Sequence, residues 1–261
     1  MKLIRITAIA ATLCLLLSAN AFAASKPKAT PTPPPVRVPV EIVAEVPEQI
    51  QQVLDIAYNE WSTLNGKNLP KCNKFTEWRG KGVKFGWCGG FITWCMLEAG
   101  VPMEVLQKTE EREVEGIVHV KEASVGKLLR GYQRMNRSTN VPQKGFLLVY
   151  GKSYNRTIHI ALVYDVQDLG NGKYRITTLE GNMSNRVRMY IHDYDMGIEK
   201  TGNLSAVPKE ERTLEETRSF SYKMQEKDWY VNTFLMPWIP GEAASTWSAS
   251  DVPMITPPPA Q

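Results

Sequence analysis

A single cysteine at the start of a predicted helix is the residue of this sequence best placed for nucleophilic chemistry. Cys88 follows Gly86 and Trp87 and opens a segment with helical periodicity. A thiol at a helix N-terminus meets the positive end of the helix dipole and unpaired backbone N–H groups, which stabilise the thiolate. The thiolate is the nucleophilic form, so this position suits attack on a carbonyl carbon. The competing interpretation is a buried structural cysteine in a tightly packed helix start.

The two residues after Cys88 are glycines, which are poor helix formers. Gly89 and Gly90 each cost about 1 kcal/mol relative to alanine inside a helix. That cost indicates the close approach of another backbone, or of a substrate, to the start of the helix.

A nucleophilic thiol needs a base, and histidine is the usual one. His159 lies in the apolar segment IHIALV, residues 158–163, where a polar ring is costly unless it has partners. His159 is therefore the candidate base, and a hydrogen-bonded core histidine is the alternative. The other two histidines, His119 and His192, are expected at the surface or in packing.

Two polar residues at the end of the next predicted strand could orient the imidazole. Glu180 and Asn182 lie two apart in TLEGN, residues 178–182, and therefore share a face. In an antiparallel hairpin the numbers of paired residues have a constant sum, and any odd sum puts His159 and Glu180 on one face. A sum near 339 would place the two directly opposite, about 5 Å apart at Cβ.

The length of the turn between these two strands decides the pairing. A two-residue turn at Asn171 and Gly172 would give a sum of 343 and set Glu180 beside Val163, too far from His159. We therefore predict a longer, looser connection. In that geometry the carboxylate of Glu180 accepts a hydrogen bond from the imidazole and supports its charged form.

The other cysteines of the predicted domain are assigned structural roles. Cys95 lies two helical turns beyond Cys88 and is expected either in the core or in a disulfide, for which Cys72, in a polar loop, is its one evident partner. The sequence has neither the paired Cys or His spacing of a zinc site nor an acidic calcium loop. We therefore predict no metal and no cofactor.

The N-terminal segment is typical of a secretory signal peptide. Lys2 and Arg5 precede an apolar run from Ala8 to Leu17, and AFA at residues 21–23 is a small-x-small cleavage site. We expect cleavage after residue 23, export to the periplasm or the medium, and no stable membrane insertion afterwards. An uncleaved membrane anchor is the alternative. Removing the segment lowers the formal charge from +4 to +2, which is too little to indicate a nucleic-acid partner.

The rest of the chain is expected to hold one folded domain between two proline-rich segments. Residues 24–40 are predicted to be a Pro-rich linker, 41–238 the folded domain and 239–261 a disordered Pro-rich tail. Periodicity predicts helices at residues 48–64, 88–99 and 122–134, and strands at 146–150, 157–166, 174–180 and 230–236. The charged stretch 192–227 is expected to be an insertion or an elaborated loop. Helices first and strands after predict an α+β domain with an antiparallel sheet.

Several of these segments together resemble the CHAP family (cysteine, histidine-dependent amidohydrolases/peptidases). GWCGGFITW at residues 86–94 is similar to the family's cysteine motif, TIHIALV at 157–163 to its histidine strand, and TLEGN at 178–182 to the end of its next strand. NTFLMP at 232–237 resembles the last strand of the family. The order and rough spacing of these segments agree with the family over about residues 47–238.

The resemblance implies a papain-like α+β fold, with N-terminal helices packed on an antiparallel sheet. It also implies hydrolysis of amide bonds, most often in peptidoglycan. Cys88 would attack, His159 would act as general base and then acid, and Glu180 would orient His159. Asn182 would assist that orientation or the polar network of the site, and backbone N–H groups at the helix start would stabilise the oxyanion.

The activity expected from the resemblance is that of an N-acetylmuramoyl-L-alanine amidase or a peptidoglycan endopeptidase. Two other functions remain open on the sequence. One is a non-catalytic cell-wall-binding or scaffolding domain that keeps the fold without turnover. The other is an exported amidase that acts on a small molecule or on a protein.

Overall fold

The computed structural model describes residues 45–105, 110–153, 156–196, 200–201 and 229–241. The predicted signal peptide (1–23) and linker (24–40), and all but the first three residues of the predicted tail (239–261), lie outside the described residues. Residues 197–199 and 202–227 of the predicted insertion also lie outside them. None of the helices in the described ranges is long and apolar enough to cross a bilayer.

Within the described residues four helices precede most of the strands, and the sequence predicts three of the four. Their bounds are α1 Glu48–Leu64, α2 Lys74–Glu77, α3 Cys88–Glu98 and α4 Val125–Arg134. α1 has the predicted bounds and buries one apolar face, formed by Ile50, Val53, Leu54, Ala57 and Trp61. It ends where Asn65 and Gly66 adopt left-handed backbone conformations, which break the helical path.

The short helix α2 was not predicted, because its sequence lies in a charged segment rich in glycine. Its start is fixed by Asn73, whose side chain accepts a hydrogen bond from the backbone N–H of Phe75. In return, the hydroxyl of Thr76 accepts a hydrogen bond from the backbone N–H of Asn73, which completes a capping box. The predicted loop before Cys88 therefore contains one helical turn, which buries Phe75 in the core.

In the part of the chain that the structure describes, seven strands form one antiparallel sheet in the order β3-β9-β4-β5-β6-β7-β8. Their bounds are β3 Ser138–Thr139, β4 Leu147–Ser153, β5 Arg156–Gly170, β6 Lys173–Glu180, β7 Arg188–Asp195, β8 Lys200–Thr201 and β9 Trp229–Leu235. β8 also pairs with β9. The strands from β9 through β4, β5, β6 and β7 to β8 therefore form a closed ring. The short strands β1 Met103–Glu104 and β2 His119–Val120 form a separate parallel pair.

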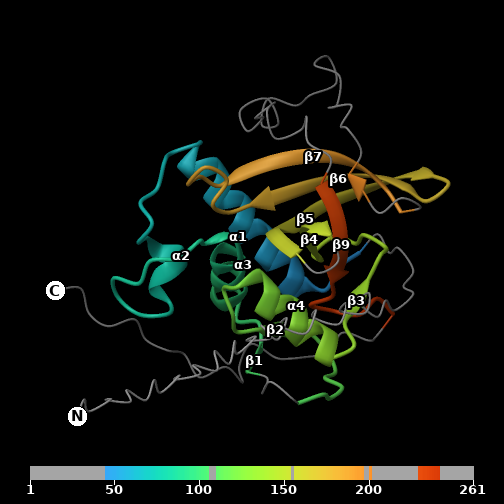
Figure 1. Ribbon diagram of the computed structural model, residues 1–261, viewed down its shortest axis with the longest axis horizontal. Helices are drawn as coiled ribbons and strands as arrows, with labels where there is room; N and C mark the ends of the chain where they lie inside the picture. The colour runs from blue at the N-terminus through green and yellow to red at the C-terminus, as the bar shows by residue number, and fades with distance from the viewer. Residues whose placement is uncertain (1–44, 106–109, 154–155, 197–199, 202–228, 242–261) are drawn as a thin grey trace, which may run out of the picture. The chain divides into compact units, whose positions relative to one another are not determined.

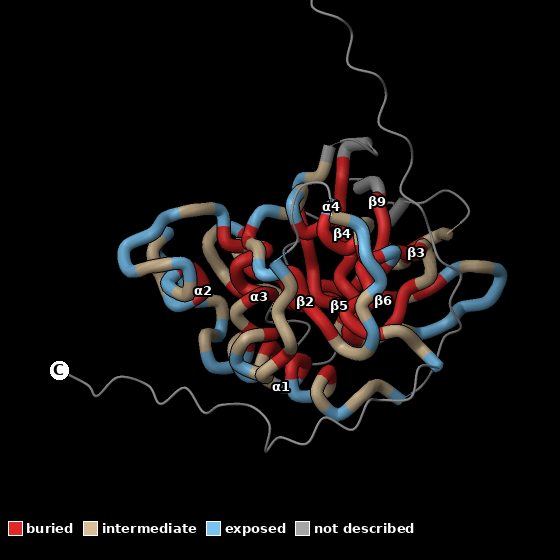
Figure 2. The backbone as a smooth tube through the Cα atoms, turned by 90° about the horizontal axis from the view of Figure 1, so that it is seen from below, coloured by how far each residue is buried: buried red, intermediate tan, exposed pale blue. Residues whose placement is uncertain are grey.

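The helices pack against this sheet, which confirms the predicted papain-like α+β fold. In Figure 1 the labelled helices lie to the left of and below the strands β5, β6 and β7. α3 contacts the other three helices as well as β2 and β5. Figure 2 shows α3 and the central strands as mostly buried. The start of α3 is therefore held by the core and faces the middle of the sheet.

The strand β7 corrects the expectation of irregular structure from residue 192 onward. Arg188–Asp195 is a regular strand that pairs with β6 along its whole length. Its charged residues have partners across the strands, since Asp193 accepts a hydrogen bond from Arg175 at 2.9 Å and Asp195 lies 3.9 Å from the Lys173 ammonium. The charges that indicated a loop are thus cross-strand ion pairs.

The hairpin between β5 and β6 has the tight turn that we expected to be absent. Gly170 pairs with Lys173, and the two turn residues Asn171 and Gly172 both have positive φ, as a type I′ turn requires. The expectation of a longer, looser connection is therefore wrong.

Two bulges on β5 correct the register that this tight turn would impose. Tyr164 and Leu169 have no opposite residue in β6, so the sum of paired residue numbers falls from 343 at the turn to 342 and then to 341. The sum is odd again at Leu162 and Leu179, and this puts His159 and Glu180 on one face. They are diagonal neighbours in this register and not the direct pair that we predicted.

Candidate active site

The start of α3 is anchored by the residue before the cysteine. Trp87 is fully buried, and its ring stacks on Phe75 with ring centroids 5.2 Å apart. Among the described residues no side chain caps the helix at Trp87. The backbone N–H groups of the first turn are therefore open to the half-buried Cys88 sulfur and to anything that binds beside it.

Close backbone contacts explain the two glycines after Cys88. A Cβ on Gly89 would overlap the carbonyl oxygen of Ala123, and a Cβ on Gly90 would lie 2.7 Å from the carbonyl oxygen of Phe75. Neighbouring backbone therefore approaches the helix start too closely for a side chain. This is one of the two reasons predicted for the glycines.

Adding a methyl group at Gly89 should consequently destabilise the protein. We expect Gly89→Ala to lower the free energy of unfolding by about 1–3 kcal/mol, because overpacking outweighs the gain in helix propensity. Thermal or urea unfolding followed by circular dichroism measures the change. Gly126→Ala in α4 is the matched control, since a Cβ there meets nothing nearer than 3.6 Å, and it should be neutral or stabilising. Equal stability of Gly89→Ala and Gly126→Ala would contradict the packing argument.

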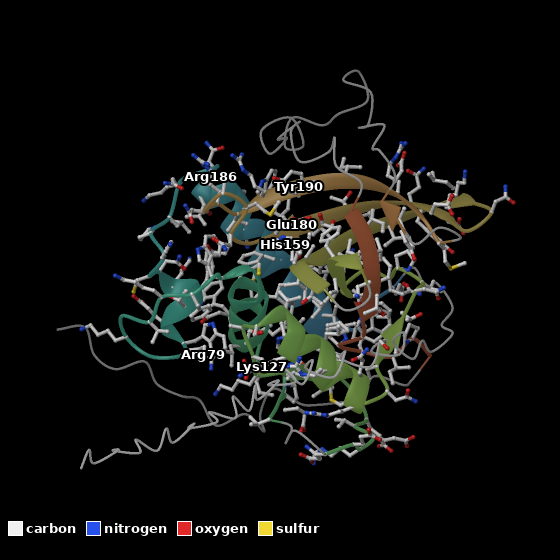
Figure 3. The ribbon with its side chains drawn as sticks, in the orientation of Figure 1. Arg79, Lys127, His159, Glu180, Arg186 and Tyr190 are labelled. Carbon is white, nitrogen blue, oxygen red and sulfur yellow. The ribbon has the colours of Figure 1, made fainter. Side chains whose placement is uncertain are left out.

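The imidazole of His159 bridges the cysteine and the glutamate. Its Nε2 lies 2.9 Å from Oε2 of Glu180, and the ring also forms a hydrogen bond with Cys88, which leaves Nδ1 for the sulfur. His159 is 7% exposed and Glu180 is 1% exposed. Figure 3 labels both residues, which come from adjacent strands. The structure thus places Cys88, His159 and Glu180 in one chain of contacts.

The charges of Cys88, His159 and Glu180 favour a thiolate on Cys88 and an imidazolium on His159. Burial acts to raise the pKa of Cys88, but the hydrogen bond and positive charge of His159, with the N–H groups of Gly89 and Cys88, hold that pKa below its ordinary value. Burial acts to lower the pKa of His159, but hydrogen bonds to Cys88 and Glu180 and the charges of both raise it well above its ordinary range. Between the two pKa values the site holds an ion pair.

The lowered pKa of Cys88 predicts thiol reactivity at unusually low pH. The alkylation rate should rise with pH through the pKa of Cys88, so its midpoint should lie below about 8.5, the ordinary cysteine value. Iodoacetamide labelling at a series of pH values, read by peptide mass spectrometry, measures the midpoint. Cys95 is the internal control, because burial and the charges of Glu60 and Glu98 raise its pKa well above the ordinary value. A Cys88 midpoint at or above 8.5 would contradict the ion pair.

Two residues that the sequence did not indicate complete the surroundings of Glu180. Thr178 donates a hydrogen bond to Oε1 of Glu180 at 2.7 Å, and the hydroxyl of Tyr150 donates to the same oxygen at 3.3 Å. Thr178 lies two residues before Glu180 and therefore on the same face of the strand, so strand alternation could have predicted its place beside Glu180. Tyr150 comes from β4, and placing it requires the register of a second strand pair.

Asn182 lies beside Gly86, a residue of the segment that leads into Cys88. It follows the end of β6 with φ 63°, and its amide nitrogen lies 3.6 Å from the position that a Cβ on Gly86 would take. Gly181 before it packs so tightly on Phe91 of α3 that any side chain would overlap that ring. The tight contact seats the end of β6 on α3 and brings Asn182 to the segment that leads into Cys88.

Of the two roles expected for Cys95, the disulfide with Cys72 is absent, because both thiols are free. Cys95 is fully buried within α3, in the hydrophobic core. Cys72 is half-buried before α2, with its sulfur 4.0 Å from a carboxylate oxygen of Glu77. The two side chains therefore occupy different environments, one in the core and one at the surface.

His119 is a packing residue, as one of the two expectations for it proposed. It is fully buried, with Nε2 2.9 Å from the Thr93 hydroxyl and Nδ1 2.8 Å from the Tyr132 hydroxyl. Burial lowers its pKa to about 3, so the ring stays neutral. His192 lies in β7.

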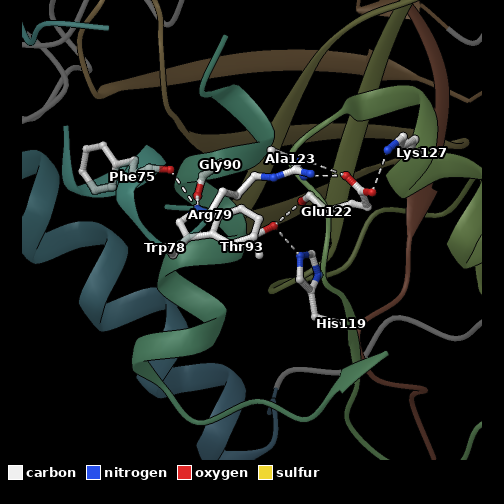
Figure 4. Close-up of polar contacts among 9 residues, drawn as sticks. All are labelled: Phe75, Trp78, Arg79, Gly90, Thr93, His119, Glu122, Ala123 and Lys127. Atoms are coloured by element: carbon white, nitrogen blue, oxygen red, sulfur yellow. Dashed lines mark hydrogen bonds and ion pairs between the residues drawn. The ribbon is translucent and has the colours of Figure 1, made fainter. Parts of the chain in front are cut away.

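A surface ion-pair group braces the start of α3 from outside (Figure 4). Glu122 accepts hydrogen bonds from Arg79 at 3.3 Å and from Lys127 at 2.9 Å, and its backbone carbonyl accepts one from Thr93 of α3 at 2.6 Å. The next residue, Ala123, supplies the carbonyl that packs on Gly89. The group thereby ties the loop before α3 and the first turn of α4 to the helix that carries Cys88.

Within the described residues no group of three or more His, Cys, Asp or Glu side chains is arranged to hold a metal ion. The side chains around Cys88 instead offer a nucleophile, a proton carrier and a carboxylate. A thiolate beside an imidazolium can attack a carbonyl carbon and protonate a leaving amine. The arrangement therefore suits acyl transfer.

Comparison with known proteins gave a match of one kind. No curated protein matches the chain, and no solved structure does. The family model of the CHAP domain matches residues 72–182. This range begins before α2 and includes Cys88, His159, Glu180 and Asn182, whereas α1 and the strands β7, β8 and β9 lie outside it. The chain therefore contains a CHAP domain at residues 72–182.

Proposed function

We propose that the protein is an exported cysteine hydrolase that cleaves amide bonds in peptidoglycan, as an N-acetylmuramoyl-L-alanine amidase or an endopeptidase. CHAP domains are typically cysteine amidases or peptidases that act on peptidoglycan. The observation that carries the proposal is the continuous contact from Cys88 through His159 to the buried carboxylate of Glu180. Export is supported by the signal-like residues 1–23.

In the proposed first half-reaction the Cys88 thiolate attacks the amide carbonyl carbon. The carbonyl oxygen takes up the negative charge and accepts hydrogen bonds from backbone N–H groups at the start of α3, including that of Cys88. His159 then gives its proton to the amide nitrogen, the C–N bond breaks, and the amine leaves. The acyl group remains on Cys88 as a thioester.

The second half-reaction returns the enzyme to its starting state. The neutral His159 takes a proton from water as the water attacks the thioester carbonyl. The C–S bond breaks, the product leaves as a carboxylic acid that gives its proton to bulk water, and Cys88 is again a thiolate beside an imidazolium. Glu180 stays ionised throughout and stabilises the positive charge on His159.

Product analysis on purified peptidoglycan tests this function. The protein should release new amino groups, and mass spectrometry of the soluble products should identify the bond that is cut. An amidase frees the amino group of the first stem residue and leaves intact glycan, whereas an endopeptidase cuts within the stem or cross-bridge. Binding to the wall without any new amino groups would reject hydrolysis and favour a wall-binding domain. Hydrolysis of an amide in a small molecule or a protein, without release of amino groups from peptidoglycan, would reject peptidoglycan as the substrate.

A further inference from the structure

Both carboxylate oxygens of Glu180 are engaged, and they serve different partners. Oε2 faces Nε2 of His159 at 2.9 Å, while Oε1 accepts from the hydroxyls of Thr178 at 2.7 Å and Tyr150 at 3.3 Å. The acid is 1% exposed, so water cannot replace a lost donor at little cost. The two hydroxyls therefore hold the oxygen that His159 does not use.

The sheet fixes these hydroxyls relative to the imidazole. Tyr150 of β4 is the direct register partner of His159 of β5, and the two rings stack with centroids 6.0 Å apart at 17°. Thr178 lies on the same strand and face as Glu180, two residues before it. Tyr150 thus contacts the candidate base with its ring and the acid behind that base with its hydroxyl.

The ionisable groups around Glu180 leave these hydroxyls as donors. Burial first, and then the charge of Glu180, raise the pKa of Tyr150 and of Tyr190 on β7 well above the ordinary value. Both phenols therefore stay protonated. Arg188 is the register partner of Glu180 on β7, but its guanidinium lies beside Gly66 at the end of α1. His159 contacts the carboxylate directly, with Nε2 2.9 Å from Oε2.

We propose that Tyr150 and Thr178 are positioning residues that hold the Glu180 carboxylate against His159, and that they act on the reaction only through this carboxylate. The inference rests on the proposed function for its effect on turnover, but the geometry can be tested without substrate. Loss of either hydroxyl leaves a buried acid with fewer donors. Such an acid is freer to turn or to take a proton, and both changes weaken the imidazolium and, with it, the thiolate.

The test uses Tyr150→Phe, Thr178→Val and the double variant in the full chain. Iodoacetamide labelling across pH gives the midpoint for Cys88 without any substrate, and peptidoglycan assays give kcat and KM. We expect each single variant to raise the labelling midpoint and to lower kcat about 10-fold, the size typical for one hydrogen bond to a charged group. The double variant should lower kcat about 100-fold, with KM unchanged. Thr178→Ser, which keeps the hydroxyl, should retain the wild-type midpoint.

Matched controls separate positioning from stability. Tyr194→Phe and Thr233→Val each remove a buried hydroxyl that donates to a backbone carbonyl, at 2.9 Å to Asn140 and 2.8 Å to Thr139. These controls should leave the labelling midpoint and kcat unchanged while altering thermal unfolding to a similar extent. If they shift the midpoint as much as Tyr150→Phe and Thr178→Val do, or if neither site variant shifts it, positioning is overturned.

The labelling and turnover readouts also distinguish this inference from the proposed function. A wild-type protein that cleaves peptidoglycan, with site variants that label like wild type, overturns the positioning role and leaves the function standing. A wild-type protein that does not cleave peptidoglycan, with site variants whose midpoint rises, supports positioning and rejects the function.

Discussion

Cys88→Ala should abolish the release of amino groups from purified peptidoglycan, with a loss of about 10⁴-fold or more in rate. The size follows from nucleophile removal in hydrolases that form a covalent intermediate, where only binding and oxyanion stabilisation remain. Because alanine is smaller and Cys88 is only half-buried, the variant should fold. A colorimetric amine assay on purified cell wall, normalised to folded protein by circular dichroism, measures the loss.

Cys72→Ala is the matched control for this substitution. Cys72 is also a half-buried free thiol, but its sulfur lies 4.0 Å from a carboxylate oxygen of Glu77. It should retain wild-type activity. Release of amino groups by Cys88→Ala at a rate near wild type would eliminate the proposed mechanism, whatever Cys72→Ala does.

Glu180→Gln should lower kcat by up to about 10⁴-fold, the loss seen when the acid behind a catalytic histidine is neutralised. Glutamine keeps the size of the side chain and an oxygen that can accept from Thr178. It removes the negative charge that raises the pKa of His159. The pKa of His159 should therefore fall, and that of Cys88 should rise, so the pH range of the ion pair narrows from both ends. The labelling midpoint of Cys88 and the pH dependence of kcat measure the two shifts.

Asp193→Asn provides the comparison for loss of a carboxylate from the same sheet. Asp193 on β7 pairs with Arg175 at 2.9 Å and is partly exposed, so its loss should cost at most about 1 kcal/mol of stability and leave kcat unchanged. A Glu180→Gln variant with the wild-type kcat and labelling midpoint would show that the charge of Glu180 has no part in the chemistry.

The elements that local patterns determine could be predicted from the sequence. The face of α1 follows from apolar residues at helical spacing, and the start of α3 follows from the signals around Cys88. Alternation along β5 and β6 correctly put His159 and Glu180 on one face. These features depend on residues close in sequence, and therefore local reasoning reached them.

The features that depend on pairing between distant segments could not be predicted. β7 resembled a loop because the partners of Asp193 and Asp195 lie on β6. The disulfide between Cys72 and Cys95 was inferred from the number of cysteines. Only the packing of α3 shows that Cys95 faces the core. Tyr150 gained its place beside His159 from the β4–β5 register, which no local motif encodes.

The bulges at Tyr164 and Leu169 make the distance along the chain between base and acid adjustable. His159 and Glu180 are 21 positions apart. A hairpin without the two bulged residues would keep the pairing of Leu162 with Leu179 and would have two residues fewer between the base and the acid. Insertions and deletions in this hairpin can therefore be absorbed far from the imidazole. Relatives with the same chemistry can differ in this interval, and a search that demands a fixed number of residues between the two would overlook them.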